Sequence, residues 1–202
     1  MKKGVNRLLS GKVWVGITFV LGLVALAVAS RTWFETPNFK PIGAVCLLCP
    51  LILASYRRWA WMVPLLIVMG SEWCFEPSAG YLVFPLVLSW TISVGIGFGL
   101  RGMIRRSWAA PGTRLSVVLA MSWLATLAAS LQFFVITNFA VWAGAGWYTP
   151  NSVGLWECYA AGLPFFRWTV QSDLCFGWLP LAIALIAARA SHLVLVRRSA
   201  VR

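Results

Sequence analysis

The stretch LQFFVITNFAVWAGAGWYTPNSVGLWECY, Leu131–Tyr159, changes character along its length. Its first residues would dissolve in a lipid tail. Its later part collects hydrogen-bonding side chains, which are Asn138, Trp142, Trp147, Tyr148, Asn151, Trp156, Glu157 and Tyr159. Such a change is expected where a transmembrane helix leaves the hydrocarbon core and enters the interface. The stretch therefore predicts the end of a membrane-spanning helix, followed by a polar, aromatic segment outside it.

The composition of the whole chain agrees with this interpretation. Of its 202 residues, 60% are hydrophobic and only 11% are charged, whereas a soluble domain carries far more charge on its surface. The 17 Lys and Arg against 5 Asp and Glu give a net charge of +12. Because the basic residues lie between apolar segments, we expect anionic membrane lipids as partners and no nucleic acid. A single transmembrane domain is expected to cover residues 1–202.

Six apolar segments follow from the hydropathy pattern. The first has the basic start of a secretory signal, but as a helix it would reach about 27 Å, close to the bilayer core. We therefore expect it to be a transmembrane helix. The third is short and contains Pro64. The six segments are Val13–Ser30, Pro41–Tyr56, Trp59–Met69, Gly80–Leu100, Leu115–Asn138 and Leu174–Val196.

The loop charges predict the orientation of these segments. The side that holds both termini carries most of the arginines and lysines. The opposite side carries all five acids, which are Glu35, Glu72, Glu76, Glu157 and Asp173. By the positive-inside rule, both termini are expected in the cytoplasm, as in a multi-pass protein of a bacterial inner (cell) membrane.

A further segment lies between the fifth and sixth apolar segments. From Ser152 to Phe166 the chain is apolar, but it contains Glu157, Gly162 and Pro164 and is too short to span a membrane. We predict a short external interfacial helix here. The expected fold class is thus an all-α integral membrane protein with about six transmembrane helices. An aromatic belt, which any membrane protein can carry, remains an alternative explanation of the Trp and Tyr residues.

Two short motifs invite functional interpretations. GFGLRG, Gly97–Gly102, matches the letters of the dinucleotide-binding fingerprint, but it closes a predicted transmembrane helix without a βαβ unit, so we reject that function. Gly95 and Gly99 are instead expected to allow close helix packing. CLLCP, Cys46–Pro50, is a C-x-x-C motif inside an apolar segment. Three roles stay open for the five cysteines: simple packing, a disulfide and a soft-metal site. Of these we do not expect the metal site. The five cysteines are Cys46, Cys49, Cys74, Cys158 and Cys175.

No catalytic set can be assembled from the sequence. The chain has one histidine, His192, and no nucleophile with a base at a recognisable spacing. We expect neither enzymatic activity nor a cofactor. Glu72 follows a short apolar segment and is either a ligand-binding carboxylate inside the bundle or an acid at the interface. Asn138 is similarly either a helix cap or a hydrogen-bond donor to a ligand.

Three stretches resemble an uncharacterised family of small bacterial membrane proteins. They are TPNFKPIGAV at Thr36–Val45, FFVITNFAVW at Phe133–Trp142 and YTPNSVGLWECYAAGLPFF at Tyr148–Phe166. The family is marked by N-F-x-P, then F-F-x-x-T-N-F-x-V-W, then Y-P-x-T-x-x-G-L-x-x-C-Y-x-x-x-x-P-F-F. It is distantly similar to the substrate-binding subunits of energy-coupling-factor transporters. Those are six-helix proteins that hold a small ligand near their external face.

The resemblance implies an external pocket. Its residues would be Asn38, Asn138, Trp142, Tyr148, Glu157, Tyr159 and Arg167, and Glu72 completes the predicted ligand-binding set. Tyr148–Asn151 departs from the usual Y-P-x-T order, and Glu72 stands where an aspartate is expected. Ala25 and Ala29 fit the A-x-x-x-A spacing that those subunits use to engage their coupling partner, but lie near the external end.

Two functions are therefore compatible with the sequence. In the first, the protein is a substrate-binding membrane subunit for uptake of a small molecule, energised by separate cytoplasmic ATPase and coupling subunits. In the second, it is a non-catalytic structural subunit of a larger membrane complex that packs against partner helices, pigments or lipids. A sealed polar cavity would favour the first, and a filled interior with broad apolar faces would favour the second. The identity of the ligand, the partner subunits and the oligomeric state are not encoded in any recognisable motif.

Overall fold

The computed structural model describes residues 18, 21–22, 24–30, 32, 36, 38–53, 57–74, 79–109 and 112–200. Helices are the only regular secondary structure in these ranges, which confirms the all-α class. Three helices within them are long and apolar enough to cross a membrane. The expectation of about six transmembrane helices is therefore confirmed only in part.

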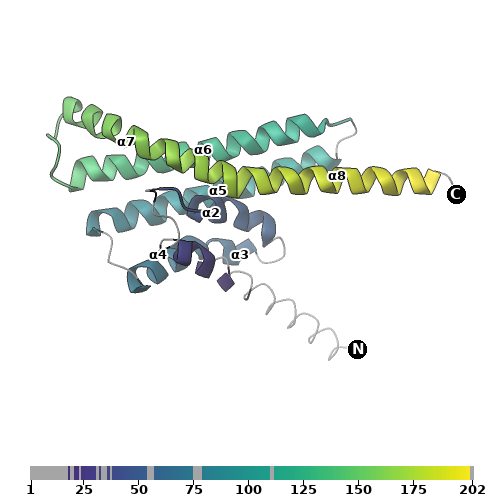
Figure 1. Ribbon diagram of the computed structural model, residues 1–202, viewed down its shortest axis with the longest axis horizontal. Helices are drawn as coiled ribbons and strands as arrows, with labels where there is room; N and C mark the ends of the chain where they lie inside the picture. Colours follow the sequence, from purple (N-terminus) through teal and green to yellow (C-terminus); the bar gives the residue numbers. More distant parts are fainter. Residues whose placement is uncertain are drawn as a thin grey trace.

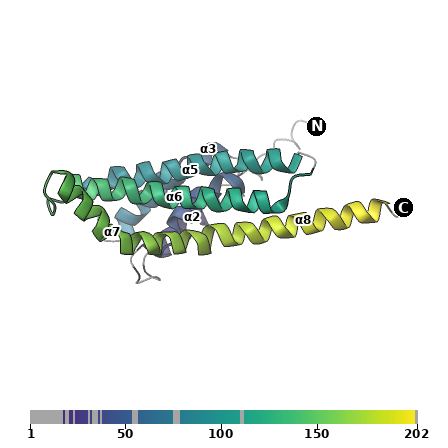
Figure 2. The same cartoon turned by 90° about the horizontal axis from the view of Figure 1, so that it is seen from above.

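Two long helices form an antiparallel pair in the middle of the molecule. Helix α5 (Gly80–Ala109) and helix α6 (Leu115–Gly144) have 30 residues each, so each is about 45 Å long. They pack against each other along their length, as both views show (Figures 1 and 2). At about 45 Å, each exceeds the hydrocarbon core of about 30 Å.

The third long element is one bent rod. It consists of helix α7 (Ser152–Asp173), a short π-helix η1 (Leu174–Trp178) and helix α8 (Leu179–Ala200). Figure 2 shows α7 returning from the end of α6 and continuing into α8, which extends to the carboxyl end of the chain. Within this rod, Ser152–Ser191 contains an apolar window long enough to be the third candidate membrane span.

The prediction of a short helix over residues 152–166 is wrong in its length. Helix α7 continues to Asp173, because the three residues that were expected to interrupt it all fit within the helix. Glu157 and Pro164 lie at exposed positions, where neither disturbs a neighbouring helix, and Gly162 is buried against the Asn138 side chain of α6. As a result, the predicted sixth span does not start at Leu174 but is the second half of a continuous helical rod.

The predicted second and third spans are short helices. Helix α2 (Ile42–Ile52) has 11 residues and helix α4 (Val63–Cys74) has 12, with the single turn α3 (Arg57–Ala60) between them. At about 1.5 Å per residue, α2 is about 16 Å long, roughly half of the hydrocarbon core. Of the predicted first span, residues 24–30 are helical, and most of its first half lies outside the described residues.

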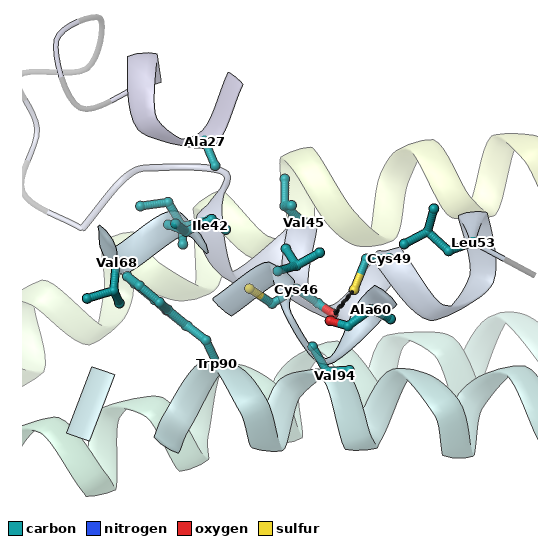
Figure 3. Close-up of a cluster of buried hydrophobic side chains, with 12 residues drawn as sticks. Ala27, Ile42, Val45, Cys46, Cys49, Leu53, Ala60, Val68, Trp90 and Val94 are labelled. Atoms are coloured by element: carbon teal, nitrogen blue, oxygen red, sulfur yellow. Dashed lines mark hydrogen bonds between the residues drawn. The ribbon is translucent and has the colours of Figure 1, made fainter. Parts of the chain in front are cut away.

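A buried apolar cluster joins these short helices to α5 (Figure 3). Gly97 of α5 allows the closest contact, because a β-carbon there would collide with the carbonyl oxygen of Leu47 in α2. Outside the backbone of α5 itself, no described atom lies within 4 Å of a β-carbon built on Gly99. The glycine that allows close helix packing is therefore Gly97, which does not belong to the predicted Gly95–Gly99 pair. The cluster consists of Ala27, Ile42, Val45, Cys46, Cys49, Leu53, Ala60, Val63, Ile67, Val68, Trp90 and Val94.

The C-x-x-C cysteines belong to this cluster. Cys46 and Cys49 are fully buried, and the Cys49 thiol lies 3.2 Å from the Cys46 carbonyl oxygen and 3.7 Å from that of Ala60 (Figure 3). Cys46, Cys49, Cys158 and Cys175 are free thiols. The burial of the first two among apolar side chains favours packing over the disulfide and metal alternatives. The Cys74 side chain lies outside the described residues.

Candidate functional site

Five of the predicted ligand-binding residues lie together around the turn between α6 and α7. Three of them donate hydrogen bonds to backbone carbonyls, Asn138 within α6 and Trp142 and Tyr159 across the turn. The Asn138 amide nitrogen donates to the Phe134 carbonyl at 2.9 Å, the Trp142 indole N–H to that of Thr149 at 3.0 Å, and the Tyr159 hydroxyl to that of Val135 at 2.7 Å. Tyr148 is half-buried and Glu157 is exposed. These bonds show that the polar aromatic stretch has a structural role at this end of the bundle.

Two other predicted residues, Arg167 of α7 and Asn38 before α2, lie at a separate place. The Arg167 guanidinium carbon is 5.1 Å from the centre of the Trp168 ring, which meets the Phe39 ring edge-on at 6.3 Å. Asn38 precedes Phe39 and is exposed. Because Arg167 follows Tyr159 by two helical turns, it lies about 12 Å further along α7. The eight predicted residues therefore do not form one cluster, and the Glu72 side chain lies outside the described residues.

A pocket of about 390 Å³ opens beside the first group. Tyr159 is the one predicted residue among its lining, and the Phe134 and Tyr159 rings meet edge-on with centroids 5.6 Å apart. This volume lies in the range of small-molecule sites. Because most of the lining side chains are apolar or aromatic, the pocket suits an apolar or amphipathic ligand. It is lined by Phe134, Ser152, Leu155, Trp156, Tyr159, Ala160 and Leu163.

The most unusual side chain of the structure is Asp173, which was not among the predicted ligand residues. It is 4% exposed, and its Oδ2 accepts a 2.7 Å hydrogen bond from the Ser130 hydroxyl of α6. It also accepts a hydrogen bond from the backbone N–H of Ala44. A β-carbon on Gly43 would lie 2.6 Å from Asp173 Oδ1. The carboxyl group is thus enclosed between α6 and the first turn of α2.

Asp173 acts as the missing N-cap of α2. The N-cap position is Pro41, whose side chain makes no capping hydrogen bond. Ala44 is the third residue after it, the position whose N–H a capping side chain normally binds. Here the acceptor comes from a different helix, which ties the start of α2 to the end of α7. A negative charge at a helix N-terminus is also favoured by the helix dipole.

The N-F-x-P motif supports the same contact. Asn38 has φ = +61°, the left-handed conformation, which turns the chain towards α2. The Phe39 ring contacts the ring of Phe176 in η1 at 5.6 Å as well as Trp168. The Lys40 carbonyl accepts a 2.7 Å hydrogen bond from the Ser172 hydroxyl. The motif therefore anchors the segment before α2 on the α7–η1 junction.

The position of Asp173 along the bundle makes it a candidate functional residue. Ser130 is the sixteenth of the 30 residues of α6, so the carboxyl group lies about 22 Å from either end of that helix. Asp173 is thus a buried residue of a helix in the middle of the bundle, whereas the loop charges placed it among the acids of the external side. An acid inside a membrane domain is costly and marks a functional site by default. The π-helix that begins at the next residue is a second feature that is frequent at functional sites.

Gln132 forms another polar contact at this height. Its amide nitrogen lies within hydrogen-bonding distance of the Ser89 carbonyl at 2.9 Å, the Ser93 hydroxyl at 3.0 Å and the Ala129 carbonyl at 2.9 Å. Its buried Oε1 has no hydrogen-bond partner, the one such atom within the described part of the chain. The middle of the bundle thus carries polar groups on both sides of α6, facing α5 and α7.

Comparisons with known proteins give a family and nothing more specific. Residues 12–194 match the model of a family of unknown function, DUF6580, and the chain belongs to this family. No curated protein matches the chain, and no solved structure does. The uncharacterised family expected from the three sequence motifs is in this sense confirmed.

Proposed function

We propose that this member of an uncharacterised family is a substrate-binding membrane subunit for uptake of a small molecule, energised by separate cytoplasmic ATPase and coupling subunits. One observation carries the proposal: an 11-residue helix, α2, begins inside the bundle at the buried carboxyl of Asp173. Membrane transporters place their sites near the midplane with helices that end inside the bundle, their N-termini facing an anionic group. A purely structural subunit would not need a carboxyl group buried inside the bundle, which is costly in a membrane domain.

The pocket beside Tyr159 is the proposed entry site of the cargo. Its apolar lining supports an apolar or amphipathic molecule rather than the polar ligand expected from Asn138 and Glu157. A ligand there would contact the rings of Phe134, Trp156 and Tyr159. Trp142 would act indirectly, because its indole N–H bonds to the Thr149 carbonyl and so keeps the α6–α7 turn in place.

The proposed orientation puts this pocket on the external side of a bacterial inner membrane, with both termini in the cytoplasm. Arg101, Arg105, Arg106 and Arg114 at the α5–α6 connection support it, since basic residues favour the cytoplasmic side. A fluorescent protein that matures only in the cytoplasm, fused after Arg202, should fluoresce. A phosphatase that is active only outside the cytoplasm should be active after Thr149 and inactive after Arg202. The reverse pattern would overturn the orientation.

Copurification tests the proposed function. The protein is purified in detergent without added ligand, and bound small molecules are extracted and identified by mass spectrometry. Ala160→Trp should fill the pocket and deplete the molecule at least tenfold. Ala161→Trp is the matched control, because Ala161 is the next residue of α7, is also exposed and does not line the pocket. A molecule retained equally by both variants, or absent from the unaltered protein, would overturn the pocket as cargo site.

The structural-subunit function is the second candidate, and one observation favours it. Trp147, Trp156 and Phe84 are 74%, 75% and 71% exposed, so large rings project from the bundle. Such rings pack against neighbouring helices, pigments or lipids. A fixed set of membrane subunits that copurifies in constant proportion, with no bound small molecule, would support this candidate and exclude uptake.

A further inference from the structure

The hydroxyl group of Ser130 has two acceptors within reach. Asp173 Oδ2 lies at 2.7 Å and the carbonyl oxygen of Thr126, one turn back on α6, at 3.2 Å. A serine hydroxyl carries one hydrogen, so it can donate to only one of the two at a time, while its lone pairs remain able to accept. Ser130 is fully buried, so water does not compete for these bonds.

This geometry satisfies either charge state of Asp173. An ionised carboxylate accepts from the Ser130 hydroxyl and from the Ala44 N–H. A neutral carboxylic acid donates its own O–H to Ser130 Oγ, while the Ser130 hydroxyl turns to the Thr126 carbonyl. No polar group loses its partner in the exchange, and rotation about one side-chain bond suffices. A fixed structural cap would require only the first arrangement.

We propose that Asp173 is a reversible proton-binding site inside the bundle, with the Ser130 hydroxyl switching its donated hydrogen bond between Asp173 and Thr126. The proton comes from water: a carboxylate and a hydronium ion give a carboxylic acid and a water molecule, and no electrons are transferred. The site is distinct from the apolar pocket and does not depend on the identity of the cargo.

Proton binding has a mechanical consequence for α2. An ionised Asp173 is held at the N-terminus of α2 partly by charge, and a neutral acid loses this attraction. The remaining ties are the bond from the Ala44 N–H to the now neutral carboxyl group, the Ser172–Lys40 hydrogen bond and the packing of Phe39 on α7 and η1. Protonation therefore loosens the start of α2 against α7.

Among the described residues of the elements packed against Asp173, few other side chains are titratable. They are Lys40, which precedes α2, Cys46 and Cys49 within α2, and Cys175 in η1. Helix α6 contributes none, because no charged or titratable side chain lies between Leu115 and Gly144. Glu157 and Arg167 belong to the same helix as Asp173 but lie at its exposed surface.

The sequence offers a direct test, because Asp173 is the sole aspartate of the chain. Cell-free synthesis with aspartate labelled with ¹³C at the side-chain carboxyl marks this one group. The labelled protein is placed in lipid nanodiscs, and its carboxyl resonance is recorded by NMR between about pH 9 and about pH 4, a range that spans the ordinary titration of aspartate. We expect one resonance that moves reversibly between the ionised and the protonated positions.

Two outcomes would overturn the proposal. A resonance that stays at the ionised position throughout would make Asp173 a permanent cap, and one that stays at the protonated position would make it a fixed donor. Ser130→Ala tests the switch, since loss of a hydrogen bond to a charged group should move the titration midpoint by about one pH unit or more. Ser122→Ala is the control: Ser122 is an equally buried serine of α6 that donates to Leu119 instead. Equal midpoints in both variants would exclude Ser130 from the site.

Discussion

Gly43 of α2 and Asp173 of α7 are packed so closely that the carboxyl group occupies the space of a side chain on residue 43. A β-carbon there would lie 2.6 Å from Oδ1 and 3.2 Å from the carboxyl carbon. The first turn of α2 is thus shaped for this one acid, from a residue 130 positions away in the chain. The N-cap residue Pro41 makes no side-chain capping bond, and the close contact of Asp173 with the helix start requires a glycine at position 43.

The first prediction concerns this glycine. Gly43→Ala should destabilise the protein by about 1–3 kcal/mol, because the added methyl group pushes Asp173 away from the Ala44 N–H. Thermal unfolding in detergent, followed by far-ultraviolet circular dichroism, measures the effect. Gly102→Ala in α5 is the control, since no described atom lies within 4 Å of its β-carbon. Equal unfolding temperatures for the two variants would contradict the contact.

The second prediction measures the bond between Asp173 and Ser130. Asp173→Ala leaves the Ala44 N–H buried without an acceptor and should cost about 1–3 kcal/mol, whereas Asp173→Asn keeps an acceptor of the same shape and should cost less. Combined with Ser130→Ala in a double-mutant cycle, the two sites should show a coupling of about 0.5–3 kcal/mol in the free energy of unfolding. Simple additivity of the two substitutions would mean that the hydrogen bond contributes nothing to stability.

The third prediction separates two glycines of one motif. Gly97→Ala places a methyl group against the Leu47 carbonyl and within 3.0 Å of Pro50 Cγ, so α2 and α5 must move apart at a cost of about 1–3 kcal/mol. In Gly99→Ala the added methyl group has no described neighbour within 4 Å. This substitution should therefore stabilise α5 by a few tenths of a kcal/mol, up to about 1 kcal/mol. Unfolding temperatures that fall in the first variant and hold or rise in the second would confirm that Gly97 is the packing residue. A loss at Gly99 instead would favour the Gly95–Gly99 pair.

The contrast between these residues explains how much of the structure could be predicted from sequence. Apolar runs predict the existence of helices well, because hydrophobic length is a local property. Helices α5 and α6 start at the predicted residues, Gly80 and Leu115, but both continue beyond their predicted ends. The packing of Gly97 on Leu47 depends on residues 50 positions apart and on a rotation of one helix against another, which no local pattern contains.

Asp173 was misplaced for a related reason. From the order of charges along the chain, the prediction placed Asp173 on the external side with the other four acids, directly before the sixth span. Its partners, Ser130 and Ala44, come from two other helices, so only the folded chain shows how the acid is satisfied.

The fourth prediction concerns the start of α7. Asn151 is its N-cap: the Asn151 side-chain oxygen accepts from the Gly154 N–H at 2.9 Å and from the Thr149 hydroxyl at 3.0 Å. Asn151→Ala should therefore cost about 0.5–2 kcal/mol in the free energy of unfolding, and Asn151→Asp, which keeps the acceptor, should cost much less. Hydrogen exchange of the peptide that contains residues 150–156 should accelerate in the alanine variant alone. Equal exchange in both variants would show that the cap does not hold this turn.

The last prediction decides between two roles of Asn38. The distant similarity to transporter subunits that the sequence analysis proposed would make it a ligand contact, whereas its φ of +61° gives it a conformational role at the turn before α2. Glycine adopts this conformation freely and a β-branched residue does so at a cost of about 1–2 kcal/mol. If the conformational role is correct, Asn38→Gly should preserve both the unfolding temperature and the copurified small molecule, and Asn38→Val should lower both. If Asn38 contacts the ligand, the glycine variant should instead keep its stability and lose the molecule, because only the side-chain amide has been removed.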